Sequence, residues 1–218
     1  MPRLLPVYVA SAALAITTAL VWPGLWLPYA LLKTLTTLLV IAHAWRLGGQ
    51  GTPMRTPLLA GLVLSLVGDV ALLWPQQGFL PGLVCFLLAH LAYLAAFTRV
   101  QRLAARAVPF LVYAAVAGVV LAALWPGIPA GLRGPVVAYV LCLGAMAAQT
   151  AVLWRHAPHH AASRRLALGG ALFLTSDALL ASNRFAQPLP LASLWILATY
   201  WSAQACIATW LAPPSRSA

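Results

Sequence analysis

Eight long apolar runs, joined by short connections, dominate this sequence and leave few folds open to it. Pro, Gly and Arg mark their limits, and the runs cover residues 4–22, 27–46, 57–74, 79–98, 107–125, 134–154, 166–183 and 190–211. A membrane-spanning helix needs roughly 20 mostly apolar residues, so a chain of 218 residues holds about eight spans and no soluble domain. The sequence therefore predicts an all-α fold, a polytopic membrane bundle of about eight transmembrane helices in which residues 1–218 form a single transmembrane domain.

The composition agrees with a membrane protein. Hydrophobic residues make up 63% of the chain and charged residues 7%, whereas a soluble domain carries about 25% charged residues. A net charge of +11 would suggest nucleic-acid binding in a soluble protein, but here the arginines lie in short connections and indicate topology instead. We expect no nucleic-acid partner. Cys85, Cys142 and Cys206 lie inside apolar runs without a CxxC pair and are expected to be small core residues.

The arginines also predict how the chain is oriented. Ten of them fall on one side of the predicted membrane: Arg3, Arg46, Arg55, Arg99, Arg102, Arg106, Arg155, Arg164, Arg165 and Arg216. Arg133 and Arg184 fall on the other side. By the positive-inside rule, both termini of this multi-pass protein should be cytoplasmic, with the bundle in the cell's inner membrane. The first run lacks a small-residue cleavage site, so we interpret it as the first span.

The sequence contains only two acidic residues, and both lie inside apolar runs. They are Asp69, in GLVLSLVGDVALLW, and Asp177, in GGALFLTSDALLAS. A carboxylate inside hydrocarbon is costly and usually serves function, with its partner nearby. Counted from the run ends, Asp69, Asp177 and Lys33 all lie roughly 8–10 Å below the same surface, so a common site is expected. The structural alternative for each aspartate is a buried helix–helix hydrogen bond or an ion pair with Lys33.

Two aspartates that meet in a medium of low dielectric constant cannot both ionise easily, so one keeps its proton. The pair then combines a general acid with a general base at neutral pH. Lys33, if it lies nearby, would hold one member ionised. Nothing in the sequence indicates which aspartate is the acid.

The segments around the two aspartates resemble each other. Residues 61–79 and 169–185 share an apolar beginning, a small residue before the aspartate, two leucines after it and a final Phe. The aspartates lie on the third and seventh runs, so a duplicated unit would contain four spans. Two four-helix halves in the same orientation would allow the two aspartate-bearing helices to face each other.

Several other polar residues have helical spacings that place them near this site. His90 and Tyr93 are three apart and share a helical face, as do Tyr200 and Gln204, four apart. His90 is expected to face the helix that carries Asp69, because the connection between the third and fourth runs is short. The alternatives are a histidine bonded to a backbone carbonyl and polar groups that join helices.

Four further residues are candidates beside the aspartates. Ser65 lies four residues before the first aspartate and Ser176 directly before the second, so either could hold a carboxyl rotamer. Asn183 and Arg184 stand where the seventh run emerges and could reach a lipid phosphate. The alternative for the last two is a solvated connection.

Metal and serine-hydrolase chemistry both find little support in the sequence. No HExxH motif occurs, and His43 lies near the cytoplasmic end of its run, far in depth from Asp69. His156, His159 and His160 lie in a cytoplasmic connection. A GxSxG motif is absent. We therefore predict no metal and no other cofactor.

The polar residues follow a pattern that resembles the YhhN family of membrane proteins, which includes the lysoplasmalogenases. The matching elements are Lys33, Ser65-Leu-Val-Gly-Asp69 with Leu72, Phe79-Leu-Pro-Gly-Leu83, His90-Leu-Ala-Tyr93 with Phe97, Gly170-Ala-Leu-Phe-Leu-Thr-Ser-Asp177, and Ala203-Gln204. One departure is Thr34, where the family tends to have Pro after the lysine.

The resemblance implies hydrolysis of the vinyl-ether bond of lysoplasmalogens to a fatty aldehyde and a glycerophospho-headgroup. Protonation of the vinyl β-carbon needs an acid that keeps its proton at pH 7 and a nearby negative charge, which an aspartate pair would supply. The expected catalytic residues are Asp69, Asp177, Lys33 and His90. The residues expected to bind the substrate are Tyr93, Tyr200, Gln204, Ser65, Ser176, Asn183 and Arg184.

The expected partner is therefore a lysophospholipid drawn from the bilayer, and the sequence does not predict an oligomeric state. The main rival is a proton-coupled or lipid transporter in which the two aspartates carry protons. That hypothesis lacks a pair of Gly- or Pro-interrupted helices at corresponding positions in the two halves. A membrane scaffold is a third hypothesis, which leaves the aspartates, His90 and Lys33 unexplained.

Overall fold

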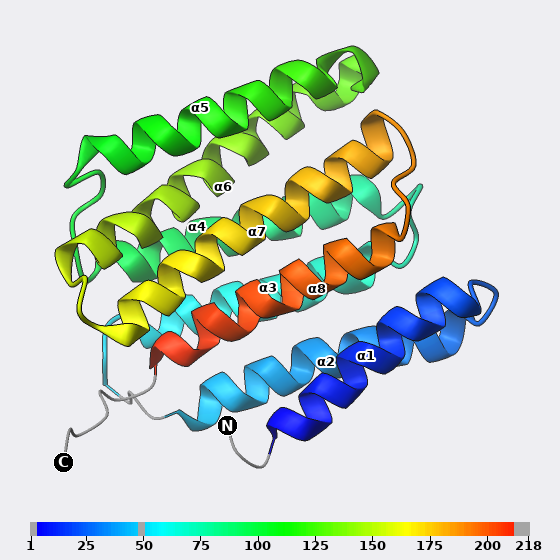
Figure 1. The fold of residues 1–218 in the computed structure, drawn as a ribbon, viewed down its shortest axis with the longest axis horizontal. Coiled ribbons are helices and arrows are strands. Elements are labelled where there is room, and N and C mark those ends of the chain that lie inside the picture. The colour runs from blue at the N-terminus through cyan, green and yellow to red at the C-terminus, as the bar shows by residue number, and fades with distance from the viewer. Residues whose placement is uncertain (1–3, 48–50, 212–218) are drawn as a thin grey trace.

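A computed structural model describes residues 4–47 and 51–211, and this part of the chain forms a bundle of α-helices without β-strands (Figure 1). Eight α-helices are described: α1 (Leu5–Val21), α2 (Trp26–Arg46), α3 (Arg55–Ala71), α4 (Phe79–Thr98), α5 (Ala107–Leu124), α6 (Ala130–His156), α7 (Ala161–Phe185) and α8 (Ala192–Ala208). Short 3-10 turns follow α5 (η1, Trp125–Gly127) and α8 (η2, Thr209–Leu211). The predicted all-α fold is confirmed.

The helices differ from the predicted runs mainly at their polar ends. α7 begins at Ala161, five residues before the apolar run at 166, and α6 extends to His156. Both extensions carry arginine, and that of α6 also carries His156; a helix accommodates these residues readily, but they add nothing to an apolar run. At the opposite end of the bundle, α3 stops at Ala71, and the following turn leads directly into α4 at Phe79.

The helices lie side by side in two layers (Figure 1). One layer contains α2, α3, α4 and α6 in that order, and the other contains α1, α8, α7 and α5. The last helix, α8, touches α1, α2, α3 and α7. This central position brings α8 against the helix that carries Asp69 and against the helix that carries Asp177.

Small residues allow the close contacts between these helices. A Cβ added at Gly169 of α7 would lie 2.9 Å from the Cβ of Cys206 in α8, and one at Gly68 of α3 would lie 2.7 Å from the ring of Phe86 in α4. Helices inside a bilayer associate through such close packing, because apolar burial gives them little driving force there.

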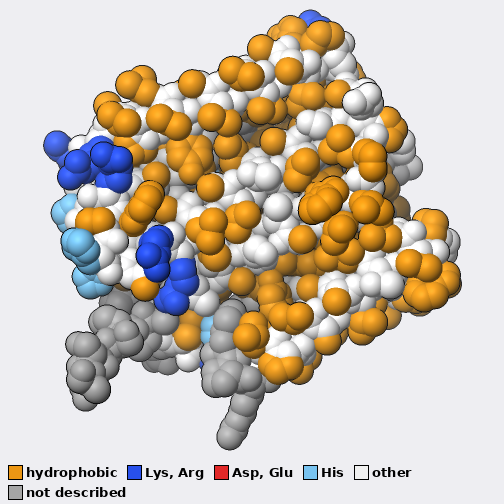
Figure 2. Space-filling model, in the orientation of Figure 1, with side chains coloured by type: hydrophobic (Ala, Val, Ile, Leu, Met, Phe, Trp, Pro, Cys, Tyr) orange, Lys and Arg blue, Asp and Glu red, His pale blue; other side chains and the backbone are white. Residues whose placement is uncertain are grey.

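The outer surface of the bundle is apolar, as a membrane protein requires. Five described helical segments are long and apolar enough to cross a membrane: Trp26–Arg46, Phe79–Thr98, Ala107–Gly127, Ala130–His156 and Ala161–Phe185. α1, α3 and α8 have 17 residues each. Hydrophobic side chains cover much of the face in Figure 2. On α5, for example, Leu111 and Val119 are 68% and 70% exposed. These features fit a multi-pass membrane protein.

Basic side chains gather at one end of the bundle. On the face shown in Figure 2, most Lys and Arg side chains and the histidines lie at the end where α6 stops and α7 starts. Of the ten arginines in the described ranges, eight belong to that end and two, Arg133 and Arg184, to the opposite end. The remaining two arginines, Arg3 and Arg216, lie outside the described residues.

Candidate active site

Lys33 and Asp69 form a buried ion pair between α2 and α3. The Lys33 Nζ lies 3.4 Å from the Asp69 Oδ1 and also donates a hydrogen bond of 3.0 Å to the backbone carbonyl of Asp69. Lys33 is 5% exposed and Asp69 is 3% exposed. The sequence predicted that these two residues lie at the same depth, and in the structure they are in direct contact.

Two hydroxyl groups complete the surroundings of the Asp69 carboxylate. Thr37 donates a hydrogen bond of 2.8 Å to Oδ2, and Tyr200 of α8 donates one of 2.7 Å to the same oxygen. A buried charge needs both a counter-ion and hydrogen bonds to its remaining lone pairs, and Asp69 has both. These surroundings suit the ionised form of the side chain.

A hydrogen-bond network behind Tyr200 fixes its position. Gln204 donates from Nε2 to the Tyr200 hydroxyl at 3.1 Å and accepts from the Tyr93 hydroxyl at 2.8 Å. The indole of Trp201 donates to the Thr37 hydroxyl at 3.3 Å. All of these side chains are buried. Gln204, which was predicted to bind substrate, therefore holds the Tyr200 hydroxyl by a hydrogen bond, and Tyr93, predicted for the same role, holds Gln204.

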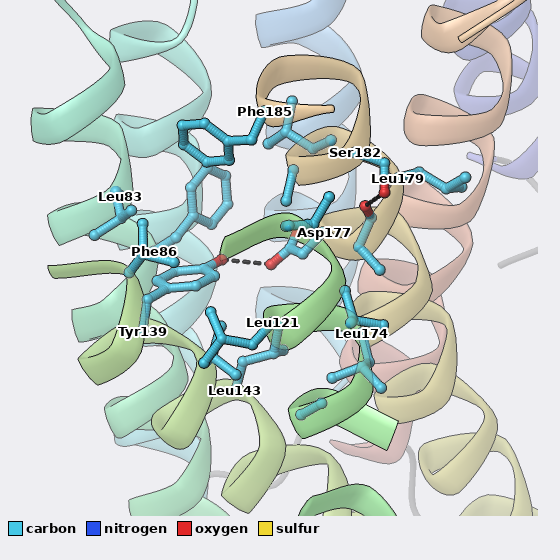
Figure 3. Close-up of a pocket in the computed structure, with 18 of the residues that line it drawn as sticks. Leu83, Phe86, Leu121, Tyr139, Leu143, Leu174, Asp177, Leu179, Ser182 and Phe185 are labelled. Atoms are coloured by element: carbon cyan, nitrogen blue, oxygen red, sulfur yellow. Dashed lines mark hydrogen bonds between the residues drawn. The ribbon is translucent and has the colours of Figure 1, made fainter. Parts of the chain in front are cut away.

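Asp177 has quite different surroundings. Its Oδ2 accepts a hydrogen bond from the hydroxyl of Tyr139 in α6 (Figure 3). Among residues 4–47 and 51–211, no lysine or arginine forms an ion pair with it, and the residue is only partly buried. The two aspartates are thus chemically unequal, although their sequence contexts are alike.

Both aspartates line one polar cavity of about 420 Å³ at the arginine-poor end of the bundle. Its walls come from α2, α3, α4, α7, α8 and the connections at that end. Its polar lining residues are Tyr29, Lys33, Asp69, Ser176, Asp177, Asn183, Arg184, Ser193 and Tyr200. In the described part of the chain, each carboxyl group is hydrogen-bonded to other side chains, so the aspartates line a common cavity without forming a directly bonded dyad.

A second cavity, of about 300 Å³, adjoins the first at Asp177 (Figure 3). Its lining is almost entirely apolar and comes mainly from α4, α5, α6 and α7, with Leu83, Leu121, Leu143 and Leu174 among its walls. The residues that line both cavities are Leu72, Phe79, Phe86, Asp177 and Leu180. Asp177 is the polar member of this shared wall.

Neither predicted serine partner contacts its aspartate carboxyl. The Ser65 hydroxyl lies 3.3 Å from that of Tyr93, and the Ser176 hydroxyl donates a hydrogen bond of 3.0 Å to the backbone carbonyl of Ile196 in α8. Ser65 joins the network behind Tyr200, and Ser176 fixes α7 against α8.

His90, which was expected to face α3, packs against aromatic rings of α6 and α7. Its ring packs edge-on against Phe173 of α7 at 4.6 Å and against Tyr139 of α6 at 5.3 Å. Neither ring nitrogen has a hydrogen-bond partner among the described residues, so the alternative of a backbone-bonded histidine is not seen either. The imidazole contacts Tyr139, the residue that holds Asp177, and lines neither cavity.

Asn183 and Arg184 line the polar cavity near its outer end. The Asn183 Oδ1 accepts a hydrogen bond of 2.9 Å from the backbone N–H of Leu189, which ties down the connection between α7 and α8. Arg184 donates a hydrogen bond to the backbone carbonyl of Pro75, and its guanidinium lies over the ring of Phe79. Both residues therefore belong to the cavity wall.

Sequence reasoning did not identify Thr37, Tyr139 or Tyr29 as site residues. Thr37 lies four residues after Lys33, on the same helical face, and that spacing was a usable signal. Tyr139 stands alone in an apolar run, where a tyrosine is typical of a core or an interface. Within the described ranges, no three His, Cys, Asp or Glu side chains group as metal ligands would.

Comparison with known proteins places the chain in a family. The model of the YhhN family matches residues 29–211. The chain is 38% identical over 159 residues to the human lysoplasmalogenase TMEM86A, an alignment that covers 72% of this chain but 65% of that relative. It is 36% identical over 191 residues to the human lysoplasmalogenase TMEM86B, covering 84% of this chain and 78% of the relative. For the bovine lysoplasmalogenase TMEM86A, the identity is 32% over 227 residues, with 95% and 87% covered.

No solved structure matches this chain significantly. The family match over residues 29–211 spans α2 to η2 and includes every residue of the two cavities. The chain therefore belongs to the YhhN family.

Proposed function

We propose that this protein is an intramembrane hydrolase that cleaves the vinyl-ether bond of lysoplasmalogens, as the names of its relatives indicate for them. The products are a fatty aldehyde and a glycerophospho-headgroup. The observation that carries the proposal is the pair of adjoining cavities, one polar and one apolar, with a carboxyl group at their common wall.

The two cavities suit the two parts of a lysoplasmalogen. The alkenyl chain occupies the apolar cavity between α4, α5, α6 and α7, and the glycerol and phosphate occupy the polar cavity. The vinyl ether lies where chain and glycerol join, and this point falls beside Asp177. A ligand site of this size, largely apolar with few polar groups, is typical of sites for small amphiphiles.

The unequal surroundings of the aspartates assign their roles. Asp69, paired with Lys33 and bonded by Thr37 and Tyr200, is the permanent negative charge. Asp177, with a single hydroxyl partner and no ion pair among the described residues, carries the proton. Asp177 donates this proton to the β-carbon of the vinyl ether, and the α-carbon and ether oxygen become an oxocarbenium ion. Asp69 stabilises the positive charge, because a fixed negative charge acts strongly in a cavity of low dielectric constant.

Water then completes the reaction. A water molecule adds to the oxocarbenium carbon and returns one proton to Asp177, which leaves a neutral hemiacetal. Transfer of the hemiacetal hydroxyl proton to the ether oxygen breaks the carbon–oxygen bond and releases the aldehyde and the free glycerol hydroxyl. One water is consumed in each turnover, and both aspartates return to their starting states. The reaction requires no covalent bond between the enzyme and the substrate.

We also propose that all eight helices cross the membrane as two four-helix halves of equal orientation. In the first half, Lys33 and Thr37 on α2 bind Asp69 on α3, and in the second half, Tyr139 on α6 binds Asp177 on α7. Each aspartate thus lies on the third helix of its half and is held by the second. The eight arginines at one end favour a cytoplasmic position for that end and for both termini, in the inner membrane.

The test is aldehyde release by the purified full-length protein in detergent. A 1-alkenyl lysophospholipid should give one aldehyde and one glycerophospho-headgroup per turnover, while its saturated 1-alkyl analogue should remain intact, because it has no double bond to protonate. Failure to release aldehyde, combined with lipid- or proton-driven flux in proteoliposomes, would favour the transporter instead. Loss of activity in a chelator that zinc restores would contradict the metal-free mechanism.

A further inference from the structure

Arg184 is held in an orientation in which no carboxylate of residues 4–47 and 51–211 forms an ion pair with its guanidinium. One terminal nitrogen donates a hydrogen bond of 3.0 Å to the carbonyl of Pro75, and the guanidinium lies 4.0 Å from the ring centre of Phe79. Its Nε is buried without a hydrogen-bond partner among the described residues. The carbonyl and the ring fix the plane of the guanidinium, but neither carries a negative charge.

The acidic residues of the chain are already engaged elsewhere. The sequence has only two, Asp69 and Asp177. Asp69 is paired with Lys33, and Asp177 is bonded to Tyr139. The polar cavity is lined by two cations, Lys33 and Arg184. With Asp69 ionised and Asp177 protonated, as the proposed function requires, the charged groups lining this cavity sum to one positive charge.

The position of Arg184 along α7 fits the spacing within the substrate. Arg184 follows Asp177 by seven residues, which is two helical turns, so both residues lie on one face about 10 Å apart along the helix axis. In an extended lysolipid, the phosphorus lies roughly 9 Å from the vinyl β-carbon, at bond lengths of about 1.5 Å. A lipid with its vinyl ether at Asp177 and its headgroup directed outward therefore brings its phosphate to Arg184.

We infer that Arg184 is the phosphate-binding residue of this protein, which anchors the singly charged phosphodiester of the lysolipid at the outer end of the polar cavity. The inference rests on the proposed function for the identity of the lipid. A guanidinium binds phosphate through two parallel N–H donors, which sets the direction of the ligand as well as its affinity. The cavity lining offers no carboxylate beyond the two aspartates for an ammonium group, so the site recognises the phosphate and not the amine attached to it.

Binding of an uncleavable lipid tests the inference separately from catalysis. The ligands are a 1-alkyl-glycerophosphocholine and a 1-alkylglycerol of the same chain length, titrated into the full-length protein in detergent. Arg184→Gln should raise the Kd of the phosphate-bearing lipid about 10- to 100-fold, the range for a lost charge-assisted hydrogen bond. The Kd of the alkylglycerol should stay unchanged, which also shows that the variant is folded. Arg184→Lys should recover part of the loss, since lysine binds phosphate as a point charge.

Arg133 provides a matched control. It is the other described arginine at this end of the bundle, it donates to the carbonyl of Ile128, and it lies over the ring of Trp125 at 5.0 Å. It lines neither cavity. Arg133→Gln should leave both dissociation constants as in the wild type. Equal weakening of both lipids by Arg184→Gln, or no weakening of either, would overturn the assignment.

Two further measurements identify the source of the phosphate and distinguish failure of this inference from failure of the hydrolase proposal. Inorganic phosphate should bind far more weakly than the phospholipid, because it lacks the chain that the apolar cavity accommodates. Equal binding would mean that the site takes free phosphate. If Arg184 binds the phospholipid as expected but alkenyl lysolipids release no aldehyde, the hydrolase proposal fails and the phosphate site remains. If alkenyl lysolipids release aldehyde but Arg184→Gln does not weaken binding of the phosphate-bearing lipid, the phosphate site fails and the hydrolase proposal remains.

Discussion

Replacing Asp177 by Asn removes the proposed acid while keeping the size of the side chain. The amide oxygen can still accept the hydrogen bond from Tyr139, so the geometry between α6 and α7 should persist. A positioned general acid contributes about 10²- to 10⁴-fold to a rate. Because protonation of the vinyl carbon is the slow step of the proposed reaction, Asp177→Asn should lower kcat by about that factor, with KM little changed. The free energy of unfolding should change by about 1 kcal/mol or less, since the residue is partly buried and the replacement keeps its hydrogen bond.

The measurement is aldehyde release from a 1-alkenyl lysolipid, alongside thermal unfolding in the same detergent. Thr199→Val is the control, because Thr199 lines neither cavity and its hydroxyl donates to the carbonyls of Trp195 and Ile196 within its own helix, α8. This control should keep near-normal kcat. If Asp177→Asn keeps more than about a tenth of the wild-type kcat, Asp177 is not the acid. Loss of a positioned general acid should lower kcat by at least about 100-fold.

Two other perturbations test the supports of the site. Lys33→Met leaves the buried Asp69 carboxylate unpaired and should cost about 3–5 kcal/mol of stability, whereas the double variant Lys33→Met/Asp69→Leu should recover most of it. Thermal unfolding measures both, and a single variant as stable as wild type would speak against a structural ion pair. Gly61→Ala introduces a Cβ into the ring of Tyr93 and should cost about 1–3 kcal/mol together with activity. Gly118→Ala, where nothing lies within 4 Å, should be neutral or slightly stabilising, and equal effects at both glycines would contradict the packing argument.

The sequence predicts the helices well because apolar length is a direct physical requirement of the bilayer. The meeting of Lys33 with Asp69 was also predictable, since both depths follow from counting residues along adjacent runs. The ends of α6 and α7 were not predicted correctly. There the helix continues through polar residues, mainly arginines, outside the apolar run, and the spacing of apolar residues carries no information about that continuation.

The site itself was predictable only in part. Asp69 and Asp177 stand out because a carboxyl group inside an apolar run is costly and is seldom kept there without a function. The difference between them depends on which side chains of neighbouring helices face each one, such as Tyr200 from α8 and Tyr139 from α6. The rotation of a helix about its axis decides this, and one sequence does not specify that rotation. The same holds for His90, whose ring contacts Phe173 of α7 and Tyr139 of α6.

The wall shared by the two cavities has a consequence for how the products leave. In the proposed reaction, cleavage beside Asp177 severs the substrate where the apolar and polar cavities adjoin, so each fragment begins in a different environment. The aldehyde retains the hydrocarbon chain and diffuses laterally among the lipid tails, because each methylene exposed to water would cost about 0.8 kcal/mol. The glycerophosphodiester, freed from its chain, dissolves into the aqueous phase beyond the arginine-poor end. On this mechanism the two products would leave in different directions, so neither would have to pass through the position that the next substrate occupies.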